Sequence, residues 1–416
     1  MENKEYKIGI VGMGYVGLPL AIAFSEHYTV FGYDIDDLRI SNLQNGIDTN
    51  FDIDFDIDSN LKLTNHIESL KNCNIYIITV PTPVDQNNNP DLSFLKSATK
   101  EVGLYLKQND IVIYESTVYP GVTEEVCVPI LENESSLIFN IDFHCGYSPE
   151  RISPGEKKYN LKDIVKITSG SNDQIAEEID FLYNKIIDAG TYKAPSIKVA
   201  EAAKVVENTQ RDINIALMNE LAMMFDKFSL DTNEILNAAS TKWNFLKFKP
   251  GLVGGHCIGV DPYYLLHKSE KLGYRATLLE SSRRINNSVS KFIAEKVFSK
   301  MLGKNKDLSD VSILIFGYTF KENCSDVRNT KVKDIIDILE SKKCNVSVFD
   351  PFINKDQCNN FVTDPFKLNE KYDVIIVAVA HNEFLKYSAE DFNVLSKEKL
   401  VLLDIKGIYS GSHWKL

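Results

Sequence analysis

The chain has 416 residues, enough for two or three domains, and its 44% hydrophobic and 25% charged residues are ordinary for a globular protein with sizeable cores. The 46 basic and 58 acidic residues give a net charge of −12, which argues against general binding to nucleic acid or to anionic membranes. No apolar run approaches the roughly 18 residues of a membrane span, and the N-terminus enters a strand without a signal-peptide core, so we expect a cytoplasmic protein.

The cysteines indicate a reducing compartment. There are seven of them, an odd number, with no C-x-x-C pair and no zinc-ligand spacing to histidine. We therefore expect reduced thiols and no metal site. Cys73, Cys127 and Cys344 have the surroundings of small buried hydrophobic residues.

The first part of the chain alternates between short apolar runs and helical segments. Strands are predicted at KIGIV (7–11), TVFGYD (29–34), NIYIITV (74–80) and DIVIYES (110–116), and in a run that ends at CGYSPER (145–151). Strands separated by helices are typical of βαβ units and a parallel sheet. We assign this domain to residues 1–197.

The rest of the chain is first helical and then α/β again. Residues 198–305 form the helical part, and apolar residues recur at helical spacing from Ile197 to Phe228 without an internal glycine or proline. A helix of this length usually joins domains or packs in a dimer. Residues 306–416 have strands at 311–317, 345–350, 372–380 and 399–407 and a helix at 330–341. The sequence thus predicts an α/β fold with two doubly wound parallel-sheet domains joined by a long central helix.

A glycine-rich turn after the first strand indicates a dinucleotide site. The turn consists of Gly12, Gly14, Tyr15, Val16 and Gly17. Glycines here allow a tight turn and close approach of a pyrophosphate, and Asp34, which ends the next strand, can bind the adenosine ribose. The acidic residue favours NAD over NADP, although Arg39 nearby leaves NADP open. A glycine turn without a ligand is the alternative.

Polar residues follow three consecutive strands of this domain. They are Thr82, then Ser116 and Thr117, then Glu150 and Arg151. The carboxyl ends of parallel strands line the ligand crevice of a doubly wound sheet, so we expect these residues at one rim. Such residues also end strands without a functional reason.

Two further segments carry charge at suggestive spacing. Lys204, Asn208 and Arg211 share one face of the long helix, which from spacing alone is most simply a solvated polar face. The segment KWNFLKFKPG (242–251) interleaves lysines with aromatic rings, which can hold phosphates and stack a base. In so acidic a chain this predicts one nucleotide rather than a polymer.

Cys257 lies in GLVGGHCIGVDPYYLL (251–266), a stretch without helical or strand period. A buried cysteine is usually inert, but backbone N–H groups among glycines can point at this thiol and at an oxyanion beside it. His256 is a candidate base whose side chain can also point elsewhere. A dinucleotide site and an exposed thiol together suggest oxidation of an alcohol to a thioester, followed by hydrolysis to an acid, with two hydride transfers.

The motifs GMGYVGLPLA, VPTP, ESTVYPG, YSPER, AEAAKVVENTQRDINIALMNE, GGHCIGVDPYY and GYTFKENCSDVRNT together resemble the UDP-glucose/GDP-mannose dehydrogenase family over nearly the whole chain. The motif GGHCIGVDPYY is similar to that of the UDP-N-acetylhexosamine branch of the family. Within this branch the sequence resembles the Vi-polysaccharide type of UDP-N-acetylglucosamine 6-dehydrogenase. The resemblance implies two Rossmann-like domains bridged by a helical dimerisation domain, NAD as cofactor, a UDP-sugar substrate, a homodimer or higher oligomer, and surface-polysaccharide (capsule) biosynthesis.

The resemblance also implies catalytic roles. Cys257 would attack the C6 aldehyde, and the resulting hemithioacetal would lose a second hydride before water releases the uronate. Lys204 and Asn208 match positions that stabilise the oxyanion, with Lys204 also serving proton transfer. Asp261 matches a carboxylate that orients base and water, and Glu150 matches an acid implicated in thioester hydrolysis.

Binding roles follow from the same resemblance. Lys321 matches a substrate contact, Arg328 matches a contact to cofactor phosphate, and Lys242 would reach a neighbouring subunit's site. The other expected substrate contacts are Arg151, Lys204, Asn208, Arg211, Phe245, Phe248, Gly251 and Gly254. One departure is Lys406, which stands where UDP-glucose members carry an arginine, so the bidentate role of that arginine does not transfer directly.

Three classes of function remain to be compared. A four-electron UDP-N-acetylglucosamine 6-dehydrogenase is favoured, with UDP-N-acetylgalactosamine and UDP-N-acetylmannosamine as alternative substrates, because the epimers differ too little for the sequence to separate them. A two-electron dehydrogenase of the hydroxyacid type needs neither a nucleophilic thiol nor the domain at 306–416. A silent nucleotide-binding protein would not need an intact set of Lys204, Cys257 and Asp261.

Overall fold

The structure is a computed structural model that describes residues 5–48, 53–54, 59–151, 161–304 and 306–416. The chain divides into two compact units. The N-terminal unit comprises the described residues of 1–207 together with 263–274, and the C-terminal unit comprises those of 208–262 and 275–416. Helices α6 (Ile197–Lys227) and α8 (Asp261–Lys271) each contribute residues to both units.

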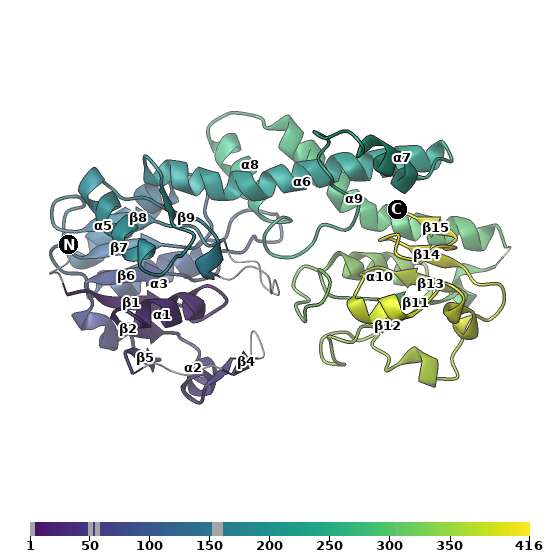
Figure 1. Ribbon diagram of the computed structural model, residues 1–416, viewed down its shortest axis with the longest axis horizontal. Helices are drawn as coiled ribbons and strands as arrows, with labels where there is room; N and C mark the ends of the chain where they lie inside the picture. The colour runs from purple at the N-terminus through teal and green to yellow at the C-terminus, as the bar shows by residue number, and fades with distance from the viewer. Residues whose placement is uncertain (1–4, 49–52, 55–58, 152–160, 305) are drawn as a thin grey trace. The chain divides into compact units, whose positions relative to one another are not determined.

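The N-terminal unit contains a parallel sheet with the strand order β5-β2-β1-β6-β7-β8 (Figure 1). Its strands are β1 (Lys7–Val11), β2 (Thr29–Tyr33), β5 (Leu61–Thr64), β6 (Ile75–Ile78), β7 (Ile111–Tyr114) and β8 (His144–Tyr147). This order, with the first strand at the centre, is that of the Rossmann fold. The predicted parallel α/β sheet is confirmed, and β5 is an additional edge strand.

The helices of this unit pack their apolar faces on the sheet. They are α1 (Gly17–Ser25), α2 (Asp37–Gln44), α3 (Ser93–Gly103), α4 (Val128–Ser135) and α5 (Asp173–Asn184). One core cluster joins residues of α1, α2 and α5 with those of β1, β2, β6 and β7. Two small strand pairs lie outside the main sheet: β3 (Ile47–Asp48) with β4 (Ile53–Asp54), and β9 (Lys166–Thr168) with β10 (Thr191–Lys193).

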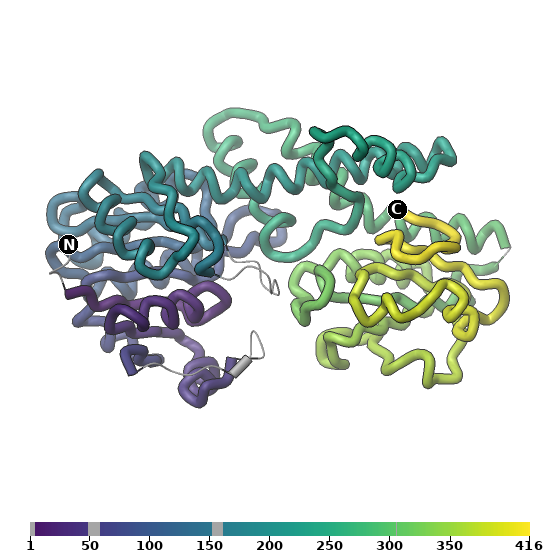
Figure 2. The backbone as a smooth tube through the Cα atoms, in the orientation of Figure 1, coloured from purple at the N-terminus to yellow at the C-terminus, as the bar shows by residue number. Residues whose placement is uncertain are grey.

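The C-terminal unit has a second parallel sheet, with the order β12-β11-β13-β14-β15. Its strands are β11 (Ser312–Phe316), β12 (Asn345–Phe349), β13 (Val374–Val377), β14 (Leu402–Asp404) and β15 (Trp414–Lys415), and its helices include α7 (Thr232–Ala239), α9 (Thr277–Leu302) and α10 (Lys331–Ser341). Residues of α9 and α10 form one core with this sheet, and aromatic residues such as Phe384 and Phe392 form another. In Figure 2 this sheet is coloured green to yellow.

The predicted long helix is confirmed as α6, which is 31 residues long. The second parallel sheet is confirmed as well, and only the two-residue strand β15 was not expected. Cys73, Cys127 and Cys344 are buried, as predicted. In the described part of the chain, no helix is both long enough and apolar enough to cross a membrane. The domain boundaries at 197/198 and 305/306 remain predictions.

Candidate active site

The glycine turn joins β1 to α1 in a conformation that requires glycine. Gly12 has a φ of +97°, and its N–H donates to Tyr33 O on β2 at 2.7 Å. A Cβ on Gly17 would lie 1.8 Å from Gly12 O, so no larger residue fits at this position. A Cβ on Gly14 would meet nothing within 4 Å, so the backbone there faces open space. The turn therefore fits a pyrophosphate at the N-terminus of α1.

Asp34 follows β2 beside this turn. Its Oδ2 accepts the Met13 N–H at 2.7 Å, its Oδ1 accepts the Asp36 N–H at 3.0 Å, and its side chain stays half-buried. Arg39 is buried, and it pairs with Asp48 at 2.6 Å and donates to Met13 O at 2.8 Å. The structure thus engages Arg39 in holding the turn, and Asp34 offers its carboxylate at the same edge.

The ends of β6 and β7 are tied together by side chains. Thr82 Oγ1 donates to Thr117 O at 2.6 Å, and Ser116 Oγ donates to Val80 O at 2.6 Å. The Tyr264 hydroxyl also donates to Thr82 O. Because the strands are parallel, these loops and the glycine turn leave the sheet at the same edge. The structure therefore brings together the strand-end residues that the sequence singled out.

Glu150 and Lys204 form a buried ion pair in the N-terminal unit. Lys204 Nζ lies 3.7 Å from Glu150 Oε2, and the two side chains are only 7% and 14% exposed. Burial raises the pKa of Glu150, and the charges of Lys204 and Lys166 oppose that rise. Lys166 also donates to Pro149 O at 2.9 Å and pairs with buried Glu115 at 2.5 Å. Glu150 therefore lies among buried charged groups, and burial increases its affinity for a proton.

Arg151, predicted as a substrate contact, is engaged within the same unit. Its guanidinium pairs with Glu207 at 3.1 Å and donates to Val165 O at 3.0 Å. These contacts hold Arg151 against α6, one turn from Lys204 along that helix. Residues 152–160, which follow it, lie outside the described part of the chain.

The loop that carries Cys257 (residues 251–260), here called the thiol loop, leads directly into α8. Cys257 O accepts the N–H groups of Val260 at 3.0 Å and of Asp261 at 2.9 Å, and the Cys257 side chain is half-buried. Gly255 has a φ of +76° and exchanges hydrogen bonds with Asn329, and a Cβ on Gly254 would lie 2.6 Å from Asn329 O. The glycines therefore let this loop pack against the backbone at Asn329, which sequence reasoning did not foresee.

Asp261 is linked to α6 by a short chain of hydrogen bonds. Asn208 Nδ2 donates to Asp261 Oδ2 at 2.5 Å, and Arg211 donates to Asn208 Oδ1. Asn208 and Asp261 are 1% and 2% exposed. His256 Nδ1 lies 3.6 Å from Asp326 Oδ2. The structure thus unites Asn208, Arg211 and Asp261 at the start of the helix that follows Cys257.

A buried polar chain fixes the loop before the thiol. Asn219 accepts the Gly251 N–H at 2.8 Å and donates to Gly251 O at 3.0 Å and to Asn286 Oδ1 at 2.8 Å. Asn286 in turn donates to Asp212, which pairs with Arg283 at 2.5 Å. Sequence reasoning missed this chain, although polar residues on the buried side of α6 were a readable signal.

The fixed loop borders a cavity of about 140 Å³ in the C-terminal unit. Its lining includes Lys249, Gly251 and Lys406. Lys406 Nζ pairs with Glu322 at 2.7 Å and lies 3.8 Å from the position of a Cβ on Gly251. The Lys406 ammonium therefore lies at the cavity and pairs with Glu322, which belongs to the segment 318–330.

The remaining predicted contacts lie on exposed segments of this unit. Phe245 and Phe248 are half-buried, Lys242 is exposed, and Lys321 is half-buried. Arg328 is 52% exposed and pairs with Asp326 at 2.6 Å. No group of histidine, cysteine and acidic side chains among the described residues could hold a metal ion.

The fold and these residues define a class. A glycine turn with a carboxylate after the second strand, a second parallel sheet with its own cavity, and a cysteine loop are those of a nucleotide-linked dehydrogenase. The chain belongs to the UDP-glucose/GDP-mannose dehydrogenase family. Family models match it at residues 6–187 (NAD binding domain), 198–288 (central domain) and 314–411 (UDP binding domain). It is an NAD-dependent oxidoreductase that acts on a UDP-sugar.

Relatives at high identity cover nearly the whole chain. The chain is 51% identical to the UDP-N-acetyl-D-glucosamine 6-dehydrogenase of Salmonella typhi, with 97% of this chain and 96% of that protein covered. It is 50% identical to the enzyme of the same name from Pseudomonas aeruginosa, with 97% of each covered. The solved UDP-D-ManNAc dehydrogenase of Pyrococcus horikoshii superposes with a TM-score of 0.89 at 30% identity, over 98% of each chain.

Proposed function

We propose that the protein oxidises C6 of UDP-N-acetyl-D-glucosamine by four electrons to the UDP-N-acetylhexosaminuronate. The choice of sugar is supported by the relatives that are about half identical over nearly their whole length. The choice of four-electron chemistry is supported by Cys257, which stands at a tight turn directly before the buried Asn208–Asp261 pair. Bound NAD accepts a hydride in each of the two oxidations.

The residues of the chain carry the remaining chemistry of this proposal. The C6 hydroxyl loses its proton as the aldehyde forms, and Lys204 serves this proton transfer. The Cys257 thiol then releases its proton to solvent as its sulfur bonds to C6, and Lys204 and Asn208 stabilise the oxyanion of the hemithioacetal. After the second oxidation C6 is a thioester, and water cleaves the C–S bond to give the uronate and the Cys257 thiol. Glu150 and Asp261 orient that water and take up its proton.

The environments of the two carboxylates suit these roles. Burial raises the pKa of Glu150, so it can hold a proton nearer to neutral pH than an ordinary glutamate. Asp261 is held by the amide of Asn208, which fixes its orientation. The glycine turn and Asp34 would hold NAD, whereas Lys321, Lys249 and the loop ending at Gly251 would hold the UDP group.

UDP-N-acetylmannosamine is the second candidate substrate. The solved Pyrococcus horikoshii enzyme, whose name contains this sugar, has the same fold along 98% of the chain. Its sequence identity is nevertheless 30%, against 51% for the glucosamine relative.

We also propose a homodimer or larger oligomer in the cytoplasm, acting in surface-polysaccharide biosynthesis. Leu217 and Met224 lie on one side of α6 and are 49% and 40% exposed, and Phe228, which follows the helix, is 59% exposed. Exposed apolar side chains of this kind suit a packed helical interface. The cysteines require a reducing compartment to stay as thiols. The molar mass from light scattering tests the oligomer.

The test of the function is the amount of NADH formed per sugar. Limiting UDP-N-acetylglucosamine, UDP-N-acetylgalactosamine, UDP-N-acetylmannosamine and UDP-glucose are supplied in parallel with excess NAD. We expect about two NADH per UDP-N-acetylglucosamine and the highest rate with that sugar. One NADH per sugar would mean that oxidation stops at the aldehyde, and a faster reaction with another sugar would replace the substrate.

The Cys257→Ser variant tests the covalent route in the same assay. It should form no uronate, because an oxygen ester or hydrate replaces the thioester poorly, and it should bind NAD with wild-type affinity. Full turnover by this variant would eliminate the thioester mechanism.

A further inference from the structure

The C-terminal sheet repeats the geometry of the dinucleotide turn. Gly317 follows β11 as Gly12 follows β1, with φ values of +88° and +97°. The Gly317 N–H donates to Phe349 O at 2.8 Å, and the Gly12 N–H donates to Tyr33 O at 2.7 Å. In both sheets the donor follows the first strand and the acceptor ends the second. The two turns are therefore equivalent in the backbone.

The carboxylate after the second strand is repeated as well. Asp350 follows β12 as Asp34 follows β2. Asp350 Oδ2 accepts the Tyr318 N–H and its Oδ1 accepts the Phe352 N–H, at 2.7 and 2.8 Å. Asp34 makes the same two types of bond, to the turn and to the residue two positions on. Each sheet thus places an aspartate where a Rossmann fold binds ribose.

The two carboxylates differ in access. The side chain of Asp350 is 0% exposed, and His381 Nε2 lies 3.0 Å from Asp350 Oδ2. The ring of Phe352 covers His381 with centroids 4.8 Å apart. His381 stands four residues after Val377, the end of β13, and Thr82 stands four residues after Ile78, the end of β6. At this equivalent position the C-terminal sheet carries the His381 ring. This ring covers Asp350, the carboxylate that stands where a Rossmann fold binds ribose.

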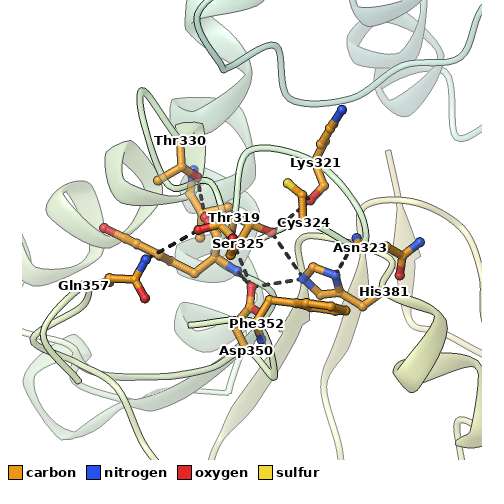
Figure 3. Close-up of polar contacts among 12 residues, drawn as sticks. Thr319, Lys321, Asn323, Cys324, Ser325, Thr330, Asp350, Phe352, Gln357 and His381 are labelled. Carbon is orange, nitrogen blue, oxygen red and sulfur yellow. Dashed lines mark hydrogen bonds and ion pairs between the residues drawn. The ribbon is translucent and has the colours of Figure 1, made fainter. Parts of the chain in front are cut away.

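The other nitrogen of His381 holds the segment that carries Lys321. The Asn323 N–H donates to His381 Nδ1 at 2.9 Å, so Nδ1 carries no proton and Nε2–H donates to Asp350 (Figure 3). Thr319 Oγ1 donates to Lys321 O at 2.9 Å. The backbone at Lys321 is therefore held by Thr319 and, two residues on, by the bond from Asn323 to His381. The Lys321 amine points away from this cluster (Figure 3).

We propose that His381 is a positioning residue for the UDP-sugar: it closes Asp350 and holds the backbone at Asn323, so that Lys321 is presented to the ligand. This inference rests on the proposed function for the nature of the ligand. The closed Asp350 no longer offers a ribose site, which leaves this sheet for UDP and the N-terminal sheet for NAD.

Two variants separate the two nitrogens of His381. In His381→Gln the amide can donate to Asp350 from the place of Nε2, but the Asn323 N–H loses its acceptor. In His381→Asn the side-chain oxygen can accept the Asn323 N–H from the place of Nδ1, and Asp350 keeps its backbone donors. The matched control is His413→Asn, because His413 Nδ1 also accepts a backbone N–H, from Leu402 at 3.2 Å, away from this segment.

Calorimetry measures the affinity of each folded variant for UDP and for NAD. We expect about tenfold weaker UDP binding for His381→Gln, because the Asn323 N–H loses its acceptor and the segment that carries Lys321 is no longer held, and near wild-type binding for His381→Asn and for the control. NAD binding should stay unchanged in all three. Wild-type UDP affinity in His381→Gln, equal losses in both His381 variants, or a joint loss of UDP and NAD affinity would each overturn the proposal.

A measurement on the wild-type enzyme covers the case in which His381→Gln does not fold. The Asn323 amide should exchange with deuterium far more slowly than an unprotected amide, because its acceptor is fully buried. Free exchange at Asn323 would also overturn the proposal. Absence of NADH from every UDP-sugar would refute the proposed function instead, whereas UDP binding unaffected by His381 would refute only the positioning role.

Discussion

Replacing Asn219 by alanine should destabilise the C-terminal unit strongly. Asn219 is 0% exposed, and its side chain makes two hydrogen bonds to Gly251 and one to Asn286. The variant leaves the Gly251 N–H, the Gly251 C=O and Asn286 Oδ1 without these partners in the interior. At about 1 kcal/mol or more for each buried group, the free energy of unfolding should fall by at least about 3 kcal/mol.

The tryptophans report this unit selectively. The chain has two tryptophans, Trp243 and Trp414, and both belong to the C-terminal unit. Trp243 is 91% exposed, whereas the Trp414 indole is half-buried and donates to Asp226 at 2.9 Å. Urea unfolding followed by tryptophan fluorescence therefore measures this unit through Trp414.

The control for this experiment is Asn214→Ala on the same helix. Its amide donates to Gln210 O within α6, so the variant should change the free energy of unfolding by less than about 1 kcal/mol. A loss in Asn219→Ala no larger than that of the control would refute the reasoning. The Asn219→Ala variant should also weaken UDP binding, because Gly251 borders the cavity and belongs to the loop that would hold UDP in the proposed function.

Two further predictions concern the N-terminal unit. Asp34→Ala should weaken NAD binding and leave UDP binding unchanged, because Asp34 is the accessible carboxylate after β2, and unchanged NAD affinity by calorimetry would remove its ribose role. Burial raises the pKa of Glu201 from 4.5 to about 7 against hydrogen bonds from Gly121 and Thr123. The folded state then holds this proton more tightly than the unfolded chain, so stability should fall as pH rises from about 4.5 to 7. Glu201→Gln should flatten that slope in urea unfolding followed by circular dichroism, and an equally steep slope in the variant would contradict the assignment.

Most of the fold could be predicted because its strands are short apolar runs buried on both faces. The strands β1, β6, β7, β11 and β13 follow this rule, and each was expected. The edge strands β5 and β15 escaped prediction, since LKLT alternates with lysine and β15 has only two residues. The side chains of β5 and β15 are less buried than those of the central strands, so their sequences carry a weaker signal.

The site was predictable only in part. Helical spacing placed Asn208 and Arg211 on one face, but nothing in the spacing connected them to Asp261, some fifty residues on. The glycines around Cys257 suggested a close approach, and the structure identifies Asn329 as one partner in that approach. Asn219 and His381 were missed, because the sequence does not show which distant groups a polar side chain contacts.

The sequence by itself determined the parallel α/β plan, the long helix, the dinucleotide turn and the thiol loop, because each depends on local periodicity or on residues close together in the chain. Only the tertiary structure decided which polar groups meet: Glu150 with Lys204, Asp261 with Asn208, and Asp350 with His381. The last pair shows the reason most clearly. The two sheets have the same turn and the same aspartate, but His381 covers Asp350, whereas Asp34 in the other sheet stays accessible. Burial of this kind depends on how segments distant in the sequence pack against one another.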